Sequence, residues 1–142
     1  MRVAARQALR FGKFQLVGLL GAAVQLLLFR LLAKRLPELV AMPLAVEAAL
    51  LHNFLWHERF TWSDRRFAGL RQRAFRLFRF HAGNGVFSIT ANILLTWGLV
   101  EWLHLRAVPS ALAAIALCAP ANFLLADCWV FAGARMKLCL RR

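Results

Sequence analysis

The chain has 142 residues, of which 61% are hydrophobic, and it carries 19 Lys and Arg against 6 Asp and Glu, a net charge of +13. Soluble domains are about 45–50% apolar, so this composition excludes an ordinary soluble domain and favours a polytopic membrane protein. The bases stand between long apolar runs and not on one amphipathic face. We therefore expect anionic membrane lipids as partners, and no nucleic acid.

Four apolar runs approach the ~20 residues that a membrane-spanning helix needs. In chain order they cover about 14–32, 39–56, 80–103 and 108–131. A secretory signal is the alternative for the first run because a basic segment precedes it, but its apolar part is longer than usual for a signal. The expected fold class is an all-α integral membrane protein with four transmembrane helices.

The distribution of the bases predicts the orientation. Most of the 19 Lys and Arg lie in the N-terminal arm, in the central loop with its flanks, or in the C-terminal tail. The four exceptions lie at or just after the end of the first run, or just before the fourth: Arg30, Lys34, Arg35 and Arg106. The positive-inside rule then places both termini and the central loop in the cytoplasm of a multi-pass membrane protein.

The chain is expected to form a single transmembrane domain, 1–142, built from two similar halves. "FGKF" at 11–14 is answered by "LFRF" at 77–80, "AMPL" around Pro43 by "AVPS" around Pro109, and "NFLWHERFTW" at 53–62 by "NFLLADCWVF" at 122–131. Each half is predicted to be a two-helix hairpin with both ends cytoplasmic. The predicted parts are repeat 1 at about 10–62, a basic loop at about 63–75, repeat 2 at about 76–131 and a basic tail at 132–142.

Nothing in the sequence predicts catalytic chemistry. The three cysteines, Cys118, Cys128 and Cys139, lack metal-ligand spacing, and their odd number gives no disulfide framework. No H-E-x-x-H motif, Ser/His/Asp set or phosphate-cradling glycine loop is present. We therefore expect a protein that is not an enzyme and that uses no metal or cofactor.

The ten-residue stretch at 53–62, repeated at 122–131, is called the doubled stretch below. It is similar to a motif of the GtrA-like family of small membrane proteins, which also occur fused to dolichol/polyprenyl-phosphate mannose synthase-like enzymes. The family pattern, roughly N-F-L-x-N-R-x-W-T-F after the second and fourth helices, resembles "NFLWHERFTW", and "FGKFQLVGLLGAAVQLLLF" at 11–29 resembles the family's first helix. The resemblance implies four helices and a role in moving polyprenyl-phosphate-linked sugars, carried on lipids such as undecaprenyl phosphate, across the bacterial inner membrane for polysaccharide biosynthesis.

The chain departs from this family pattern in both copies of the motif. The first copy keeps Arg59 but places His57 and Glu58 before it. The second copy has Asp127 and Cys128 where basic residues are expected. If both copies bind phosphate in the family, only the first can do so here in the same way, so we expect unequal halves.

Glu47 is the most informative single residue because it lies near the middle of the second apolar run. A carboxylate there costs about 2.5–3.5 kcal/mol on insertion scales, so it should face the bundle interior or a wet cavity. One interpretation is a packing residue paired with Gln25. The other is a polar site for a sugar headgroup, or a proton-coupling group.

Side-chain amides recur at membrane depth, where lipid offers no hydrogen-bond partner. Asn53 and Asn122 lie near the cytoplasmic ends of the second and fourth runs. They either cap or bridge helices, or they donate to a lipid phosphate or sugar hydroxyl. In the third run, Asn84, Ser88, Asn92 and Thr96 share one helical stripe. These amides and the Glu47 carboxylate are packing contacts or part of a polar track for the headgroup: Gln25, Glu47, Asn53, Asn84, Asn92 and Asn122.

The helix mouths combine cations with aromatic rings. Arginine suits a phosphate because its planar fork donates two hydrogen bonds at once. The candidate phosphate-binding collar consists of Lys13, Arg59 and Arg79, with Arg10 and Arg76 beside them. Phe60, Trp62, Trp129 and Phe131 are expected to lie at the headgroup level, where such rings concentrate, with sugar stacking as the alternative.

The leading functional hypothesis is a flippase for a lipid-linked sugar. Four helices enclose little space, so we expect a homodimer with the path at an interface. One alternative is a small multidrug-type exporter, although that family carries its acid in the first helix, where this chain has Gln25. Another is a non-transporting anchor that recruits a membrane glycosyltransferase.

Overall fold

The computed structural model describes residues 2–65 and 69–132, so the predicted tail beyond residue 132, with Cys139, lies outside the described residues. The chain divides into two compact units, Met1–Arg66 and Phe67–Arg142. Each unit contains one helical hairpin, and we refer to them as hairpin 1 and hairpin 2. No strand occurs in the part of the chain that the structure describes.

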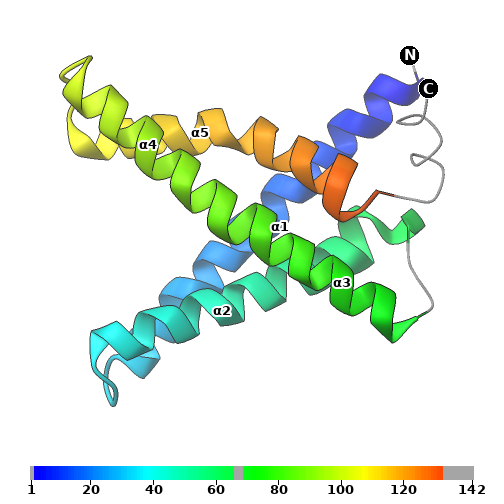
Figure 1. Cartoon of the computed structure of the whole chain (residues 1–142), viewed down its shortest axis with the longest axis horizontal. Helices are drawn as coiled ribbons and strands as arrows, with labels where there is room; N and C mark the ends of the chain where they lie inside the picture. Colours follow the sequence, from blue (N-terminus) through cyan, green and yellow to red (C-terminus); the bar gives the residue numbers. More distant parts are fainter. Residues whose placement is uncertain (1, 66–68, 133–142) are drawn as a thin grey trace. The chain divides into compact units, whose positions relative to one another are not determined.

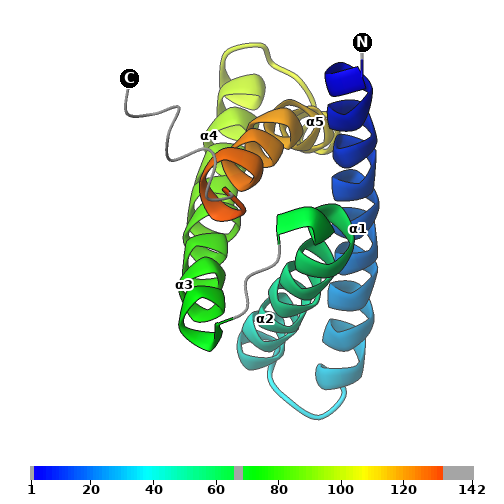
Figure 2. The same cartoon turned by 90° about the vertical axis from the view of Figure 1, so that its right-hand side faces the viewer.

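Hairpin 1 consists of α1 (Arg2–Leu32) and α2 (Glu38–Trp56), which run antiparallel and side by side (Figures 1 and 2). A π-helical turn, η1 (His57–Thr61), and a 3₁₀ turn, η2 (Ser63–Arg65), follow α2. Ala41, Ala45 and Ala49 are buried along one face of α2. Their four-residue spacing aligns them, and their small size lets two helix backbones approach closely.

Hairpin 2 begins with α3 (Leu70–Phe80), continues through the π-helical segment η3 (His81–Phe87) and ends its first arm with α4 (Ser88–Glu101). Figure 1 shows α3 and α4 as one continuous rod. The second arm is α5 (Ala107–Leu125), followed by the π-helical turn η4 (Ala126–Val130). A small-residue stripe is again buried on the second arm: Ser110, Ala114 and Cys118.

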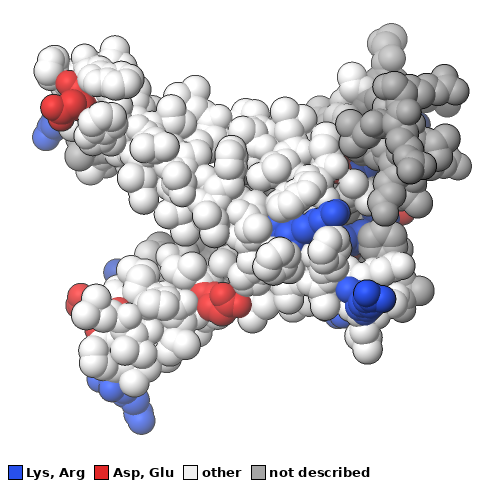
Figure 3. Space-filling model, viewed as in Figure 1, with Lys and Arg blue, Asp and Glu red and all other residues white. Residues whose placement is uncertain are grey.

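The structure confirms the prediction of four membrane spans. Four helical segments are long and apolar enough to cross a membrane: Ala4–Leu32, Glu38–Thr61, Leu70–Glu101 and Val108–Val130. Figure 3 shows that the visible helix surfaces are mostly uncharged, with most Lys, Arg, Asp and Glu near the hairpin ends. Large apolar side chains are exposed along the spans, as a lipid environment permits, for example at Leu19, Leu39, Ile93 and Leu112.

The third helix begins ten residues earlier than the apolar run that predicted it, at Leu70 instead of residue 80. Residues 70–75, expected in the basic loop, are therefore helical. Arginine has a high helix propensity, so the cluster of bases ends the hydrophobic pattern without ending the helix. The turn between α4 and α5 contains His104 at a φ of 52°, a left-handed conformation that histidine adopts more readily than most residues.

The two proline motifs are not equivalent in the structure. α2 starts at Glu38 and α5 at Ala107, so Pro43 lies inside its helix while Pro109 lies in the first turn. A proline in the first turn removes no intrahelical hydrogen bond, whereas Pro43 does. The equivalent positions are those of the buried stripes, in which Ala41 corresponds to Ser110 and Ala45 to Ala114.

Candidate functional site at the open ends of the hairpins

The doubled stretch folds in the same way in both hairpins. Each copy ends an α-helix, enters a five-residue π-helical turn and closes on an aromatic residue. The Trp62 N–H donates to the His57 carbonyl at 2.8 Å, and the Phe131 N–H donates to the Ala126 carbonyl at the same distance. The repetition in sequence therefore encodes one local structure, built twice.

This turn folds the closing ring back onto the first helix of its hairpin. Trp62 and Phe131 are each 0% exposed. The Phe14 ring meets Trp62 edge-on at a centroid distance of 6.0 Å, and Phe80 meets Phe131 in the same way at 6.2 Å. Trp62 and Phe131 are thus core residues of the hairpin ends and are not accessible for stacking on a sugar, while the depth of these ends in the bilayer stays a prediction.

The buried core at the open end of hairpin 1 contains a histidine, His57, and is therefore more polar than the corresponding core of hairpin 2. His57 is buried, stacks on Phe14 at 4.8 Å and meets Trp62 at 5.3 Å. Its Nδ1 shares a hydrogen bond of 3.1 Å with the Thr61 hydroxyl. The corresponding residues of hairpin 2, Ala126 and Val130, are apolar. The two ends share a framework but differ in chemistry.

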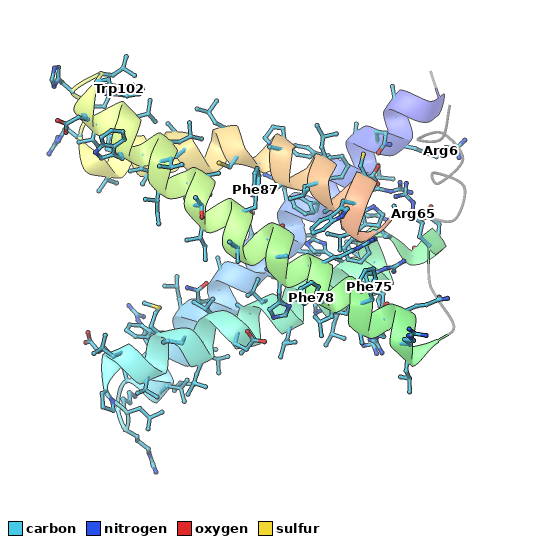
Figure 4. The ribbon with its side chains drawn as sticks, in the orientation of Figure 1. Arg6, Arg65, Phe75, Phe78, Phe87 and Trp102 are labelled. Atoms are coloured by element: carbon cyan, nitrogen blue, oxygen red, sulfur yellow. The ribbon has the colours of Figure 1, made fainter. Side chains whose placement is uncertain are left out.

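The cations of the first helices pair with exposed aromatic rings in both hairpins. Lys13 Nζ lies 4.7 Å from the centre of the Phe60 ring. Arg79 lies 5.6 Å from the Trp129 ring, and its Nη1 donates to the Trp129 carbonyl at 3.3 Å. A second ring, Phe75 on α3 (Figure 4), lies 4.4 Å from the Arg79 guanidinium. Phe60 and Trp129 are exposed, and their depth in the bilayer stays a prediction.

Two further predicted phosphate-binding residues, Arg10 and Arg76, also contact groups of their own hairpin. Arg10 Nη2 forms a 2.9 Å ion pair with Asp64 Oδ2. Arg76 is 2% exposed, and its guanidinium lies 5.0 Å from the Phe131 ring. The guanidinium groups of Arg10 and Arg76 therefore already contact groups of their own hairpin. Lys13 and Arg79 are half-buried and Arg59 is exposed, and a role of these cations in binding phosphate stays a prediction.

The sequence-based analysis missed a pair of buried acids. Glu58 is 7% exposed and Asp127 is 4% exposed, and they occupy the same position of the doubled stretch. Neither is without a partner. Asp127 is therefore not where the second copy departs from the first. Among the charged residues, the copies differ at the next position, where Cys128 replaces Arg59, and aligning the two copies with each other would have shown it.

The asparagines of the doubled stretch bridge the helices of their hairpins. In hairpin 1 a methyl group at Gly21 would overlap the Asn53 amide, so the absence of a side chain on α1 admits this amide. In hairpin 2 the Ser88 hydroxyl donates to Asn122 Oδ1 at 2.8 Å. Asn92 Nδ2 donates to the Ser88 carbonyl at 2.9 Å, so Ser88, Asn92 and Asn122 lie together. These contacts fit the packing interpretation, and a role of the same side chains in a polar track stays a prediction.

The remaining polar candidates are placed less centrally. Glu47 is exposed and follows Ala45 by two residues, about 200° around the helix, so it points away from the buried alanine stripe. The expectation that it faces the interior of the bundle is not met within hairpin 1. Gln25 on α1 and Asn84 in η3 are both half-buried. No group of three or more His, Cys, Asp or Glu suited to a metal occurs among the described residues.

A small open groove lies on the last turns of hairpin 1. It is lined by His52, Leu55, Trp56 and Arg59. The spacing i, i+3, i+4 and i+7 places these side chains on one helix face. Arg59 thus stands beside two rings that were not among the predicted site residues.

The open end of a hairpin is the end opposite the turn that joins its two arms. In both hairpins this end brings together a cation from the first helix, an exposed aromatic ring and the buried ring that ends the doubled stretch. Arg6 and Arg65 lie at this same end of hairpin 1, and Trp102 lies at the turn of hairpin 2 (Figure 4).

No curated protein matches the chain. The family described as the GtrA/DPMS transmembrane domain matches residues 13–131, from the collar lysine to the ring that closes the second copy of the motif. The chain belongs to the GtrA/DPMS transmembrane-domain family.

Proposed function

We propose that the protein moves a polyprenyl-phosphate-linked sugar across the bacterial inner membrane, as a non-catalytic carrier with both termini in the cytoplasm. Membership of the family fits the handling of lipid-linked sugars. The observation that carries the proposal further is the pairing of cation and exposed ring at the open end of both hairpins, Lys13 with Phe60 and Arg79 with Trp129.

The pairing suits a lipid phosphate for two physical reasons. A cation held over an aromatic ring is positioned by that contact, whereas a lysine side chain without such a contact is mobile. A phosphate at the hairpin mouth can accept hydrogen bonds from such cations while its polyprenyl tail stays in the surrounding lipid. We propose that the path lies between two copies of the chain, since the described residues of one copy form four spans and enclose little space. Light scattering of the purified protein in detergent should then give the mass of a dimer.

The test is transport by the full chain in liposomes. Purified protein is reconstituted with a lipid-linked sugar, and the fraction of sugar reached by an external, membrane-impermeant reagent is followed in time. Replacing Lys13 and Arg79 together by Gln should slow the exchange about tenfold or more, the loss expected when a charge-assisted hydrogen bond disappears. Arg106→Gln, at the opposite end of hairpin 2, is the control and should exchange like the wild type.

Two results would contradict the proposal. Wild-type protein that leaves the lipid-linked sugar on its original side would favour the anchor for a glycosyltransferase. Transport of a cationic dye without exchange of the sugar lipid would favour the exporter.

A further inference from the structure

The groove of hairpin 1 has no chemical counterpart in hairpin 2. Asn53 corresponds to Asn122 and Trp62 to Phe131, as the matching turns show. The groove residues His52, Leu55, Trp56 and Arg59 therefore correspond to Ala121, Leu124, Leu125 and Cys128. Hairpin 1 has two rings and a cation where hairpin 2 has only small or apolar side chains.

The groove residues form a set suited to a phosphate followed by a sugar. Arg59 is exposed at the end of the second span, where a guanidinium can bind a phosphate by two hydrogen bonds. Trp56 is 48% exposed, and its ring lies 6.2 Å from that of His52. Such rings present an apolar face together with an N–H donor, the combination that the faces and hydroxyls of a sugar require.

A role in topology alone explains this arrangement less well. An arginine that only fixes orientation needs its charge and no particular neighbours. Arg65, at the same end of hairpin 1, lies on η2 and outside the groove. Arg59 shares one helix face with Trp56 and His52.

We propose, on the basis of the proposed function, that this groove binds the headgroup of the lipid-linked sugar and that each chain has one such site. Arg59 binds the phosphate of the lipid-linked sugar, and Trp56 and His52 contact the first sugar. The exposed Leu55 leaves the adjoining surface apolar for the lipid tail. Hairpin 2 contributes its cation and ring but no sugar site.

The experiment measures binding to the full chain in nanodiscs of phosphatidylcholine. The probes are a short-chain prenyl phosphate and the same lipid carrying glucose, galactose or mannose in turn. Wild-type protein should bind one glycosylated lipid per chain. Arg59→Gln should weaken both kinds of probe about tenfold or more. Trp56→Leu should weaken a glycosylated probe while leaving the bare prenyl phosphate nearly unchanged.

Matched controls exist for both substitutions. Arg65→Gln removes a cation at the same end of hairpin 1, and Trp97→Leu removes an exposed tryptophan of α4 that packs on Trp102. Both should bind like the wild type. The site proposal is overturned by wild-type binding in the Arg59 and Trp56 variants, or by two glycosylated lipids per chain. It is also overturned if phosphatidylglycerol displaces glycosylated and bare probes equally well, which would indicate a general anionic-lipid site.

Binding and transport together separate the two proposals. Wild-type protein that binds as predicted but does not move the lipid contradicts the proposed function and leaves the site standing. Arg59 and Trp56 variants that bind and transport normally, beside Lys13 and Arg79 variants that do not transport, contradict the site alone.

Discussion

At the scale of single residues, Gly21 and Asn53 show how closely the two arms of hairpin 1 approach. A methyl group at Gly21 would overlap the Asn53 amide, so Gly21→Ala must displace that amide or separate α1 from α2. We expect this substitution to lower the free energy of unfolding by about 1–3 kcal/mol, the usual cost of overpacking. Unfolding in mixed detergent micelles measures it.

Gly18→Ala is the matched control, because a methyl group at Gly18 meets nothing within 4 Å. Alanine is the better helix former, so the control should be neutral or slightly stabilising. Equal destabilisation by the two substitutions would refute the close approach at Gly21.

The hydrogen bond between Ser88 and Asn122 is the corresponding residue contact of hairpin 2. A double-mutant cycle of Ser88→Ala and Asn122→Ala should give a coupling energy of about 0.6 kcal/mol, the average for hydrogen bonds between membrane helices. Unfolding of the wild type, both single variants and the double variant provides the four values. Strictly additive effects would show that the contact at 2.8 Å contributes nothing to stability.

At the scale of the elements, each hairpin depends on a stripe of small residues on its second arm. Ala45 on α2 and Ala114 on α5 are both 0% exposed. Leucine at either position adds side-chain volume where two helices meet, so each substitution should lower the free energy of unfolding by about 1–3 kcal/mol. The exposed alanines Ala23 and Ala116 are the controls, and leucine there should have little effect.

If the two small-residue stripes are equivalent, leucine substitutions in them should have equal effects on stability. Ala45→Leu and Ala114→Leu should destabilise by similar amounts if the hairpins pack alike. A loss at one position only would show that the second arms pack differently, despite the matching burial.

The π-helical segment η3 explains why the first arms do not match residue for residue. Phe14 and Gly21 lie seven positions apart, whereas the corresponding Phe80 and Ser88 lie eight apart. A π-helical turn accommodates one extra residue without ending the helix, and such turns are frequent at functional sites. The third span therefore keeps both its ring contact to Phe131 and its hydrogen bond to Asn122.

The spans were predictable because run length is a strong signal, while the details of the ends were not. The doubled stretch indicated a repeated structure, but no periodicity marks a five-residue π-helical turn. Trp62 was therefore expected among headgroups and lies in the core. Arg76 and Arg79 look alike in the sequence, and only the packing of α3 against η4 distinguishes the buried guanidinium from the half-buried one.

At the scale of the whole molecule, two hairpins of similar framework carry different surfaces. Both ends hold a buried acid, a closing ring and a cation–ring pair, whereas the buried His57 and the groove lined by Trp56 and Arg59 belong to hairpin 1. A repeat with only one headgroup site predicts that substitutions in the two halves have unequal effects on transport. Arg59→Gln should slow exchange about tenfold or more, and Cys128→Ala should leave the rate unchanged.

The central claim is that the open ends of both hairpins face the cytoplasm, where their cations meet the lipid phosphate. The most direct measurement is labelling of single cysteines in intact cells by a membrane-impermeant maleimide, in a variant whose native cysteines are replaced. Leu36→Cys and Leu105→Cys, in the turns of the two hairpins, should react from outside. Ser63→Cys and Gln72→Cys, at the open ends, should react only after permeabilisation, and their labelling in intact cells would contradict the account.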